Sequence, residues 1–318
     1  MNRHMYRIYG VIVDSAFALS SVEPCAETLP VDISLVAGTP DWFERVAAGL
    51  REDCEEWIRY TILEDGGVYI RINQVLEAIV AADGRRVVAA RLEDAEDRTF
   101  EANLTNFALS ASLTLQGEEC LHATVVEIDG RAVGLLGPSG AGKSTLAAFL
   151  LTEGATLVTD DMLRVSFAEK GVLAYPGPHR LKLFEPTALR FLPHAASAGD
   201  FNRLSRKIMV TPAPHRDTGR PAPVHAPLPL SALFWLGNDE PADGAPEISM
   251  RRLAGIEQVK VLTQSTMARR YMAPERLKRQ LRFAEKLARL MPIYALDYRR
   301  DYELLGKVAR KLRQTAGE

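Results

Sequence analysis

The sequence has few cysteines and no excess of charge of either sign. Its 318 residues contain only Cys25, Cys54 and Cys120, which are too far apart for a CxxC metal or redox pair. An odd number of thiols fits a reducing cytosol better than a disulfide framework, so we interpret them as buried or free thiols. Lys plus Arg number 39 against 41 Asp plus Glu, a net charge of −2. A global basic field that would collect nucleic acid or anionic lipid is therefore excluded.

Long apolar runs are missing as well. The first apolar segment, Ile8–Asp14, is too short and too interrupted for a signal-peptide core, and no run reaches transmembrane length. We therefore expect a cytoplasmic protein without a nucleic-acid or membrane partner. A composition of 47% hydrophobic and 25% charged residues is typical of a globular protein, and the length favours two domains.

Short strands dominate the chain up to about residue 92. Four β-branched or aromatic runs predict them: Tyr6–Val13, Val31–Val36, Trp57–Leu63 and Val68–Ile72. Asp83-Gly84 lies between two further apolar runs and predicts a two-residue hairpin turn with positive φ at both positions. We expect residues 1–95 to form a smaller β-rich α+β domain. Since this part has no phosphate loop, we predict that it recognises the phosphate acceptor.

The second part of the chain is predicted to begin after a helix that connects the two halves, over residues 96–117. A hairpin is expected where Ala123–Ile128 and Arg131–Leu136 flank Asp129-Gly130, again with positive φ at both turn residues. The second of these strands runs into a glycine-rich loop. A helix over Lys143–Thr152 and a short buried strand at Thr156–Thr159 follow.

Farther along, three apolar runs predict a meander of strands over this loop: Leu163–Phe167, Val172–Tyr175 and Leu181–Phe184. Arg180 and Lys182 alternate with leucines in the last run, so that one strand face is basic. That face fits phosphate binding and plain solvation equally well. Six prolines between Thr211 and Pro229 predict a long mobile loop, which is a candidate lid or simply disordered. Helices are expected over Pro274–Leu290 and from Tyr302.

The glycine-rich loop has the spacing of a phosphate-binding loop. Residues 137–144 read Gly-Pro-Ser-Gly-Ala-Gly-Lys-Ser, a match that arises by chance in a chain of this length with a probability of about 1%. Glycines let backbone N–H groups wrap a phosphate while the next helix directs its positive dipole end at it. Lys143 is expected to reach the β- and γ-phosphates and Ser144 to ligate Mg²⁺. The predicted ATP-binding residues are Gly137, Pro138, Ser139, Gly140, Ala141, Gly142, Lys143, Ser144 and Thr145.

Two adjacent acids, Asp160 and Asp161, end the next predicted strand. One is expected to serve the metal while the other takes the proton from an attacking hydroxyl. Neighbouring side chains at a strand end point in opposite directions, so we assign Asp160 to the hydroxyl, near His122, and Asp161 to Mg²⁺. The two roles are exchangeable on this reasoning. An isolated histidine such as His122 is usually a structural residue.

The order of these segments resembles a known family. Leu121-His122-Ala123, the hairpin Val126–Val133, the loop 137–145 and Leu157–Asp161 together are similar to the catalytic domain of HPr kinase/phosphorylase and its relatives, including lasso-peptide-cluster kinases. The resemblance implies an α/β P-loop kinase domain of the HPr kinase/phosphoenolpyruvate carboxykinase type over residues 118–318. It also implies a catalytic His122, which orients or charges the acidic base. Thr145 stands where the regulatory enzyme has an acidic residue, and its Pro-Gly-Arg-Asn segment is missing, so the resemblance supports the kinase reaction more than its reverse.

We therefore predict a kinase that depends on ATP and Mg²⁺ and phosphorylates a hydroxyl, foremost a Ser of a protein or peptide. The expected catalytic residues are Asp160, His122 and Lys143, and the expected metal ligands are Ser144 and Asp161. Three alternatives stay open: a P-loop NTPase, a nucleotide-gated binding module and a small-molecule kinase. The sequence does not identify the acceptor, and it is compatible with a homo-oligomer.

Overall fold

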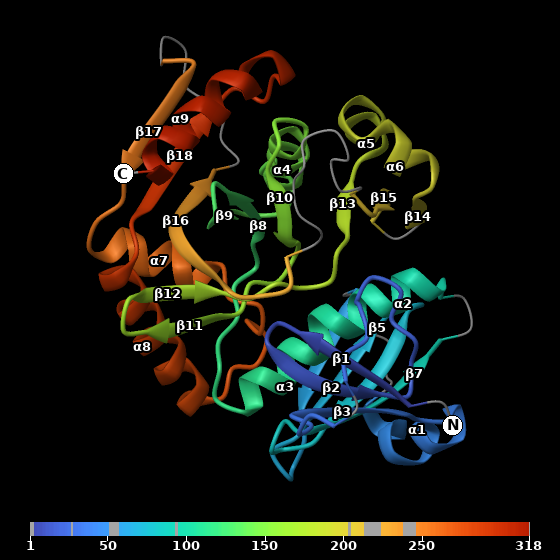
Figure 1. The fold of residues 1–318 in the computed structure, drawn as a ribbon. Coiled ribbons are helices and arrows are strands. Elements are labelled where there is room, and N and C mark those ends of the chain that lie inside the picture. The colour runs from blue at the N-terminus through green and yellow to red at the C-terminus, as the bar shows by residue number, and fades with distance from the viewer. Residues whose placement is uncertain are drawn as a thin grey trace. The chain divides into compact units, whose positions relative to one another are not determined.

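The computed structural model describes residues 3–26, 28–50, 57–92, 95–202, 205–212, 224–237 and 246–317. The chain forms two units, which Figure 1 shows as ribbons. Unit 1 contains Met1–Cys120 and Met267–Arg279, and unit 2 contains Leu121–Thr266 and Gln280–Glu318. None of the helices in the described ranges combines the length and the apolar character needed to span a bilayer.

Unit 1 is built on a seven-stranded sheet in the order β1-β2-β3-β7-β6-β5-β4. Strand β3 runs parallel to its neighbours β2 and β7, and the other pairs are antiparallel. Its strands are β1 (His4–Ile8), β2 (Val11–Ser15), β3 (Ile33–Ala37), β4 (Ile58–Ile62), β5 (Val68–Ile72), β6 (Leu76–Val80) and β7 (Arg86–Arg91). Its helical segments are α1 (Pro40–Ala47), a 3-10 turn (Ala48–Leu50), α2 (Asp97–Asn103) and α3 (Leu109–Leu115).

Two predictions of local structure in unit 1 need correction. The run Tyr6–Val13 is not one strand, because Tyr9 and Gly10 have φ of 53° and 78° and turn the chain between β1 and β2. The hairpin around Asp83-Gly84 exists as β6 and β7, but only Gly84 has positive φ there. The amide of Ala81 donates to Arg86 O at 2.9 Å, which closes a four-residue loop instead of the predicted two-residue turn.

The connecting helix predicted over residues 96–117 forms with an irregularity in its middle. A π-type turn over Leu104–Ala108 joins α2 to α3. At its end the amide of Leu109 reaches back to Leu104 O, five residues earlier. The inserted residue keeps both halves helical while rotating the buried face of one relative to the other.

Unit 2 is centred on an eight-stranded sheet. Its middle strands β9 (Arg131–Leu136), β16 (Leu228–Leu236) and β18 (Ile293–Tyr298) run parallel to one another. Antiparallel strands complete the sheet: β8 (Thr124–Ile128), β10 (Thr156–Thr159), β11 (Val165–Ala168), β12 (Gly171–Ala174) and β17 (Ile248–Arg252). The turn between β8 and β9 has φ of 51° at Asp129 and 81° at Gly130, which confirms the predicted two-residue hairpin.

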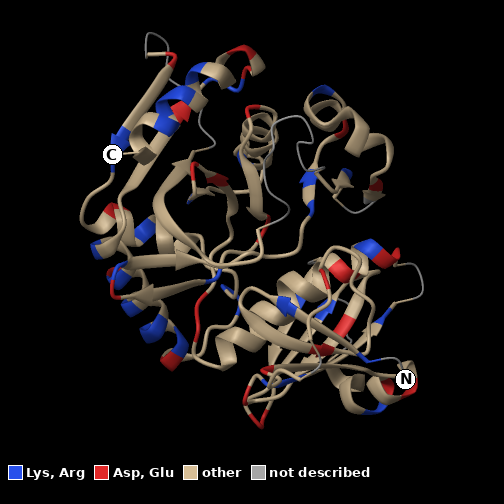
Figure 2. Ribbon diagram, viewed as in Figure 1, with Lys and Arg blue, Asp and Glu red and all other residues tan. Residues whose placement is uncertain are grey.

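Helices cover both faces of this sheet. Val126, Val133 and Leu135 share a hydrophobic core with α4 (Lys143–Thr152) and α9 (Leu305–Gly317). On the opposite face the core includes Val125 and Ala132 and extends to α7 (Ile256–Gln264) and α8 (Pro274–Leu290). Helix α8 buries Ala284 and Leu287 there, while Figure 2 shows basic residues along its length. A short 3-10 helix, Tyr302–Leu304, precedes α9.

The predicted meander over the glycine loop is wrong in its last strand. Strands β11 and β12 belong to the eight-stranded sheet, but β13 (Leu181–Leu183) pairs with β15 (Lys207–Val210) in a separate sheet. That sheet is completed by β14 (Asp200–Asn202) and carries α5 (Glu185–Phe191) and α6 (Pro193–Ser197). The pairing of β13 with β15 is non-local, so the pattern of the individual run does not reveal it.

The proline-rich loop predicted over 211–229 ends earlier than expected. Strand β16 begins at Leu228, and Pro229 takes part in it opposite Leu173 of β12. Residues 213–223, which include His215, Arg216 and Arg220, lie outside the described residues.

A fully buried ion pair ties together distant parts of unit 1. Arg276 donates to both carboxylate oxygens of Glu119, at 3.1 Å from Nε and 2.7 Å from Nη2. The two side chains are only 1% and 2% exposed. An unpartnered charge at this depth is costly. The pair therefore fixes how the segment around Glu119 packs against the start of α8.

We expect Glu119→Gln to lower the free energy of unfolding by about 3–5 kcal/mol, because the guanidinium of Arg276 loses its counter-charge. The double variant Glu119→Leu/Arg276→Met should be less destabilised than Glu119→Gln. Urea unfolding monitored by circular dichroism measures both. If the double variant is the least stable of the set, the two side chains are not energetically coupled.

Candidate functional site

The glycine loop takes the shape that a phosphate-binding loop requires. It connects the end of β9 to the start of α4, and Gly137, Gly140 and Gly142 have φ of 139°, 87° and 89°. A Cβ atom on Gly137 would lie 2.4 Å from Leu236 O. No other residue fits this position, because it combines a positive φ with a close approach of two backbones.

Lys143 begins helix α4 and folds over the loop. Its Nζ donates to Gly137 O at 2.8 Å and to Pro138 O at 3.1 Å, and the residue is 7% exposed. Burial lowers the pKa of its ammonium. The N-cap residue Gly142 provides no side-chain acceptor for the first amides of the helix. These amides and Lys143 together suit a phosphate.

Asp160 follows β10, which has the same direction as β9 because both are antiparallel to β8. The carboxylate is therefore at the same sheet edge as the glycine loop. Its Oδ1 accepts from the Thr124 hydroxyl at 2.7 Å and its Oδ2 from the Lys182 amide at 3.0 Å. The residue is 5% exposed. Burial, reinforced by the negative charge of Asp161, raises the pKa of the Asp160 carboxyl.

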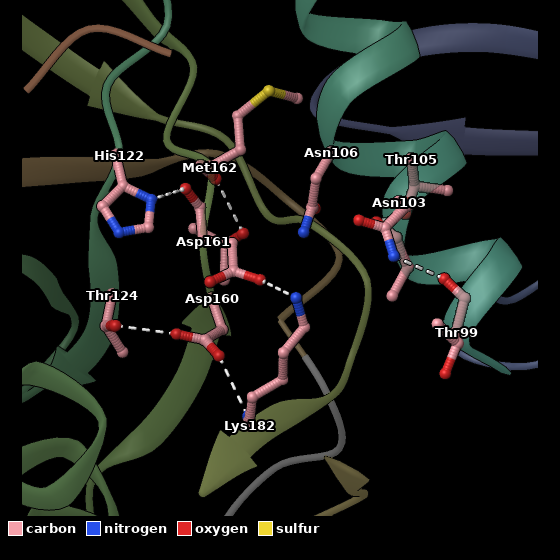
Figure 3. Close-up of polar contacts among 12 residues, drawn as sticks. Thr99, Asn103, Thr105, Asn106, His122, Thr124, Asp160, Asp161, Met162 and Lys182 are labelled. Carbon is pink, nitrogen blue, oxygen red and sulfur yellow. Dashed lines mark hydrogen bonds and ion pairs between the residues drawn. The ribbon is translucent and has the colours of Figure 1, made fainter. Parts of the chain in front are cut away.

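Asp161 has the opposite electrostatic environment. Burial alone would raise the pKa of its carboxyl, but the Lys182 ammonium pairs with Oδ2 and holds that pKa below its ordinary range. Its backbone is left-handed, with φ of 70°, which is uncommon outside glycine. Figure 3 shows Lys182 reaching Asp160 with its main-chain nitrogen and Asp161 with its ammonium. Lys182 thus contacts both carboxylates, but burial and the charge of Asp161 outweigh it at Asp160, whereas its ammonium outweighs burial at Asp161.

His122 contacts Asp161 and not Asp160, contrary to our expectation. Its Nδ1 lies 3.0 Å from the main-chain oxygen of Asp161 (Figure 3). Because a carbonyl only accepts, Nδ1 carries the proton and Nε2 is left as an acceptor. Burial and the positive charge of Lys143 lower the pKa of the imidazole to about 4. The ring is therefore neutral at pH 7, which contradicts the expected role of a protonated imidazole that charges the base.

The remaining predicted residues fit a divalent ion bound together with phosphate. Ser144 and Thr145 lie in the first turn of α4 and are partly exposed. In the part of the chain that the structure describes, no three His, Cys, Asp or Glu side chains converge as a metal site. Mg²⁺ is usually bound by one or two carboxylates and by the phosphates of its nucleotide. Ser144 and Asp161 therefore stay the predicted ligands of such a partial set.

Two contributors to the site were not among the predicted site residues. Thr124 holds Asp160, and no motif distinguishes it within its strand. Lys182 bridges both carboxylates. The alternation of Arg180 and Lys182 with leucines was the available signal for it, but that pattern is equally typical of a solvated strand face.

Comparisons with known proteins indicate a relationship in sequence. No family model matches the chain. It is 34% identical to HPr kinase/phosphorylase of Exiguobacterium sibiricum over 116 residues, 36% of each chain. It is 32% identical to HPr kinase/phosphorylase of Azoarcus over 137 residues, 42% of this chain and 44% of the relative. The chain thus covers less than half the length of these relatives. The matches confirm the resemblance to HPr kinase/phosphorylase.

A comparison with solved structures finds the HPr(Ser) kinase/phosphatase from Coxiella burnetii. The match covers 61% of this chain and 94% of that one, at 12% identity. Its TM-score is 0.34, which is too low to compare the two folds in detail.

We predict that the imidazole of His122 titrates near pH 4 in the metal-free protein. Its folded-state pKa lies below the unfolded value of about 6.5. The folded state therefore binds fewer protons between pH 6.5 and pH 4, and protonation of His122 favours unfolding as the pH falls through this range. NMR titration of the ring protons, assigned with His122→Gln, measures the pKa. Lys143→Ala should raise it, and a value at or above 6.5 in the parent protein would contradict the prediction.

Proposed function

We propose that this HPr kinase-like chain transfers the γ-phosphoryl group of ATP to the hydroxyl of a serine in a protein. The observation that carries the proposal is the position of the glycine loop beside two carboxylates with opposite pKa shifts. A loop of this shape suits a phosphate chain. Two neighbouring acids held at different pKa values suit a base and an ionised ligand.

The loop residues 137–145 hold the triphosphate in this proposal. The amides at the start of α4 donate to the phosphates, and Lys143 leaves the carbonyls of Gly137 and Pro138 to neutralise the β- and γ-phosphates. Ser144 and Asp161 hold Mg²⁺, which supplies charge neutralisation at the phosphates when bound. The depressed pKa of Asp161 supports this role, since a metal ligand must be ionised.

Asp160 acts as the base. The acceptor oxygen forms a bond to the γ-phosphorus, the bond from that phosphorus to the bridging oxygen of ADP breaks, and the hydroxyl proton passes to the Asp160 carboxylate. A raised pKa makes this carboxylate a better proton acceptor than its neighbour. Thr124 and the Lys182 amide fix its two oxygens and leave further lone pairs for the incoming proton.

His122 and Lys182 position the carboxylates. The Nδ1–H of His122 supports the left-handed backbone of Asp161 through its main-chain oxygen. The Lys182 ammonium compensates the Asp161 charge in the metal-free protein. Bound Mg²⁺ would compete with Lys182 for the Asp161 carboxylate. The Lys182 ammonium would then be free to contact the phosphates.

The acceptor is proposed to be a protein, and the printed name of the relatives makes HPr the first candidate. Residues 1–95 are proposed to recognise it, since they contain no phosphate loop, and the reaction is proposed to occur in the cytoplasm. Water as acceptor, which would make the chain an NTPase, is the main alternative.

We expect label from [γ-³²P]ATP to pass to a serine of purified HPr in the presence of Mg²⁺. Lys143→Ala should abolish the transfer, because the loop loses its mobile positive charge. Lys170→Ala, at the exposed turn between β11 and β12, serves as the matched control. Equal release of inorganic phosphate with and without HPr would favour the NTPase, and ATP binding without turnover would favour a binding module.

The two carboxylates should respond differently to removal of their charge. Asp160→Asn should keep the affinity for Mg·ATP within a few-fold and slow phosphoryl transfer by roughly 10²–10⁴, as expected for a general base. Asp161→Asn should weaken binding of Mg·ATP itself. Calorimetric titration and single-turnover assays separate the two effects. The reverse pattern would exchange the roles, and parent rates in both variants would refute the mechanism.

A further inference from the structure

The three-stranded sheet β13-β15-β14 has two chemically different faces. Leu181, Leu183 and Ile208 belong to the hydrophobic core shared with α4. Side chains alternate along a strand, and Leu183 is paired with Ile208. The opposite face therefore carries Lys182 and Lys207, with Phe184 continuing it beyond the end of β13.

This second face is directed at the carboxylate pair. The Lys182 ammonium on it reaches Asp161. On the neighbouring strand, the Lys207 ammonium lies over the ring of Phe184, 5.1 Å from its centroid. Phe184 is itself 51% exposed. Its ring therefore does not fill the core and makes a cation–π contact with the Lys207 ammonium.

Lys207 has no carboxylate within ion-pair distance among the described residues, unlike Lys182. Its place on the same sheet face as Lys182, whose ammonium reaches Asp161, directs it toward the carboxylate pair. Burial is the main reason that the pKa of Lys143 is lowered, and the positive charge of Lys207 lowers it further. Asp160 and Asp161 offset this repulsion in the protein itself, and a phosphate between the two ammonium groups would offset it further.

We infer that Lys207 binds the terminal phosphoryl group of ATP, which is then held between Lys143 of the loop and Lys207 of β15. The inference rests on the proposed function and adds a phosphate-binding residue that no motif marks. Lys143 lies at the start of α4 and Lys207 at the start of β15 in the three-stranded sheet. The terminal phosphoryl group would therefore link the glycine loop to this sheet. The diphosphate product lacks this group and so makes no contact with Lys207.

The test compares affinities for Mg·ATP and Mg·ADP by isothermal titration calorimetry. Lys207→Gln should weaken Mg·ATP binding by about ten-fold or more, the effect of one charge-assisted hydrogen bond. Its affinity for Mg·ADP should stay within two-fold of the parent value, which also shows that the variant is folded. Lys207→Arg should retain most of the preference for ATP, and the control Lys170→Gln should bind both nucleotides like the parent.

Equal weakening of both nucleotides, or no change in either, would overturn the role of Lys207 while leaving the proposed kinase intact. A parent protein that binds neither nucleotide would overturn the proposed function and this inference with it.

Discussion

Gly137 lies where β9 gives way to the phosphate-binding loop, against the main-chain oxygen of Leu236 at the end of β16. The parallel pairing of β9 with β16 brings these two backbones together, and only a residue without a side chain fits between them. This close approach fixes the direction in which the loop leaves the sheet. The start of α4 and the position of Lys143 follow from it, so the geometry of the whole site depends on this contact.

The sheet then brings the acids to the same edge as the loop. The hairpin β8–β9 and the pairing of β10 with β8 give β9 and β10 a common direction, although they are not neighbours. Lys182 and Thr124 complete the arrangement from two other strands. The resulting cluster contains buried cations and carboxylates together, and each charge is tolerated because another compensates it. This mixture of charges is the reason for proposing a nucleotide that brings its own metal ion as the ligand.

The difference between Asp160 and Asp161 arises from environments that adjacent residues seldom have. The left-handed backbone at Asp161 turns the chain so that one carboxylate is buried against Thr124 and the other meets an ammonium. A non-glycine residue in this conformation is strained, and such strain is frequent at functional sites. The contact from His122 supports that backbone, in keeping with the positioning role proposed for the neutral histidine.

The sequence by itself determined the phosphate loop, the flanking strand and helix, and the hairpin at Asp129-Gly130, because each depends on neighbouring residues with strong local preferences. It also placed Asp160 and Asp161 at a strand end. Only the tertiary structure decided which residues surround them. The pairing of β13 with β15, the reach of Lys182 and Lys207, and the contact of His122 with Asp161 all join segments distant in the chain. Local patterns carry no information on such contacts, since packing and charge compensation select them only once the sheets have formed.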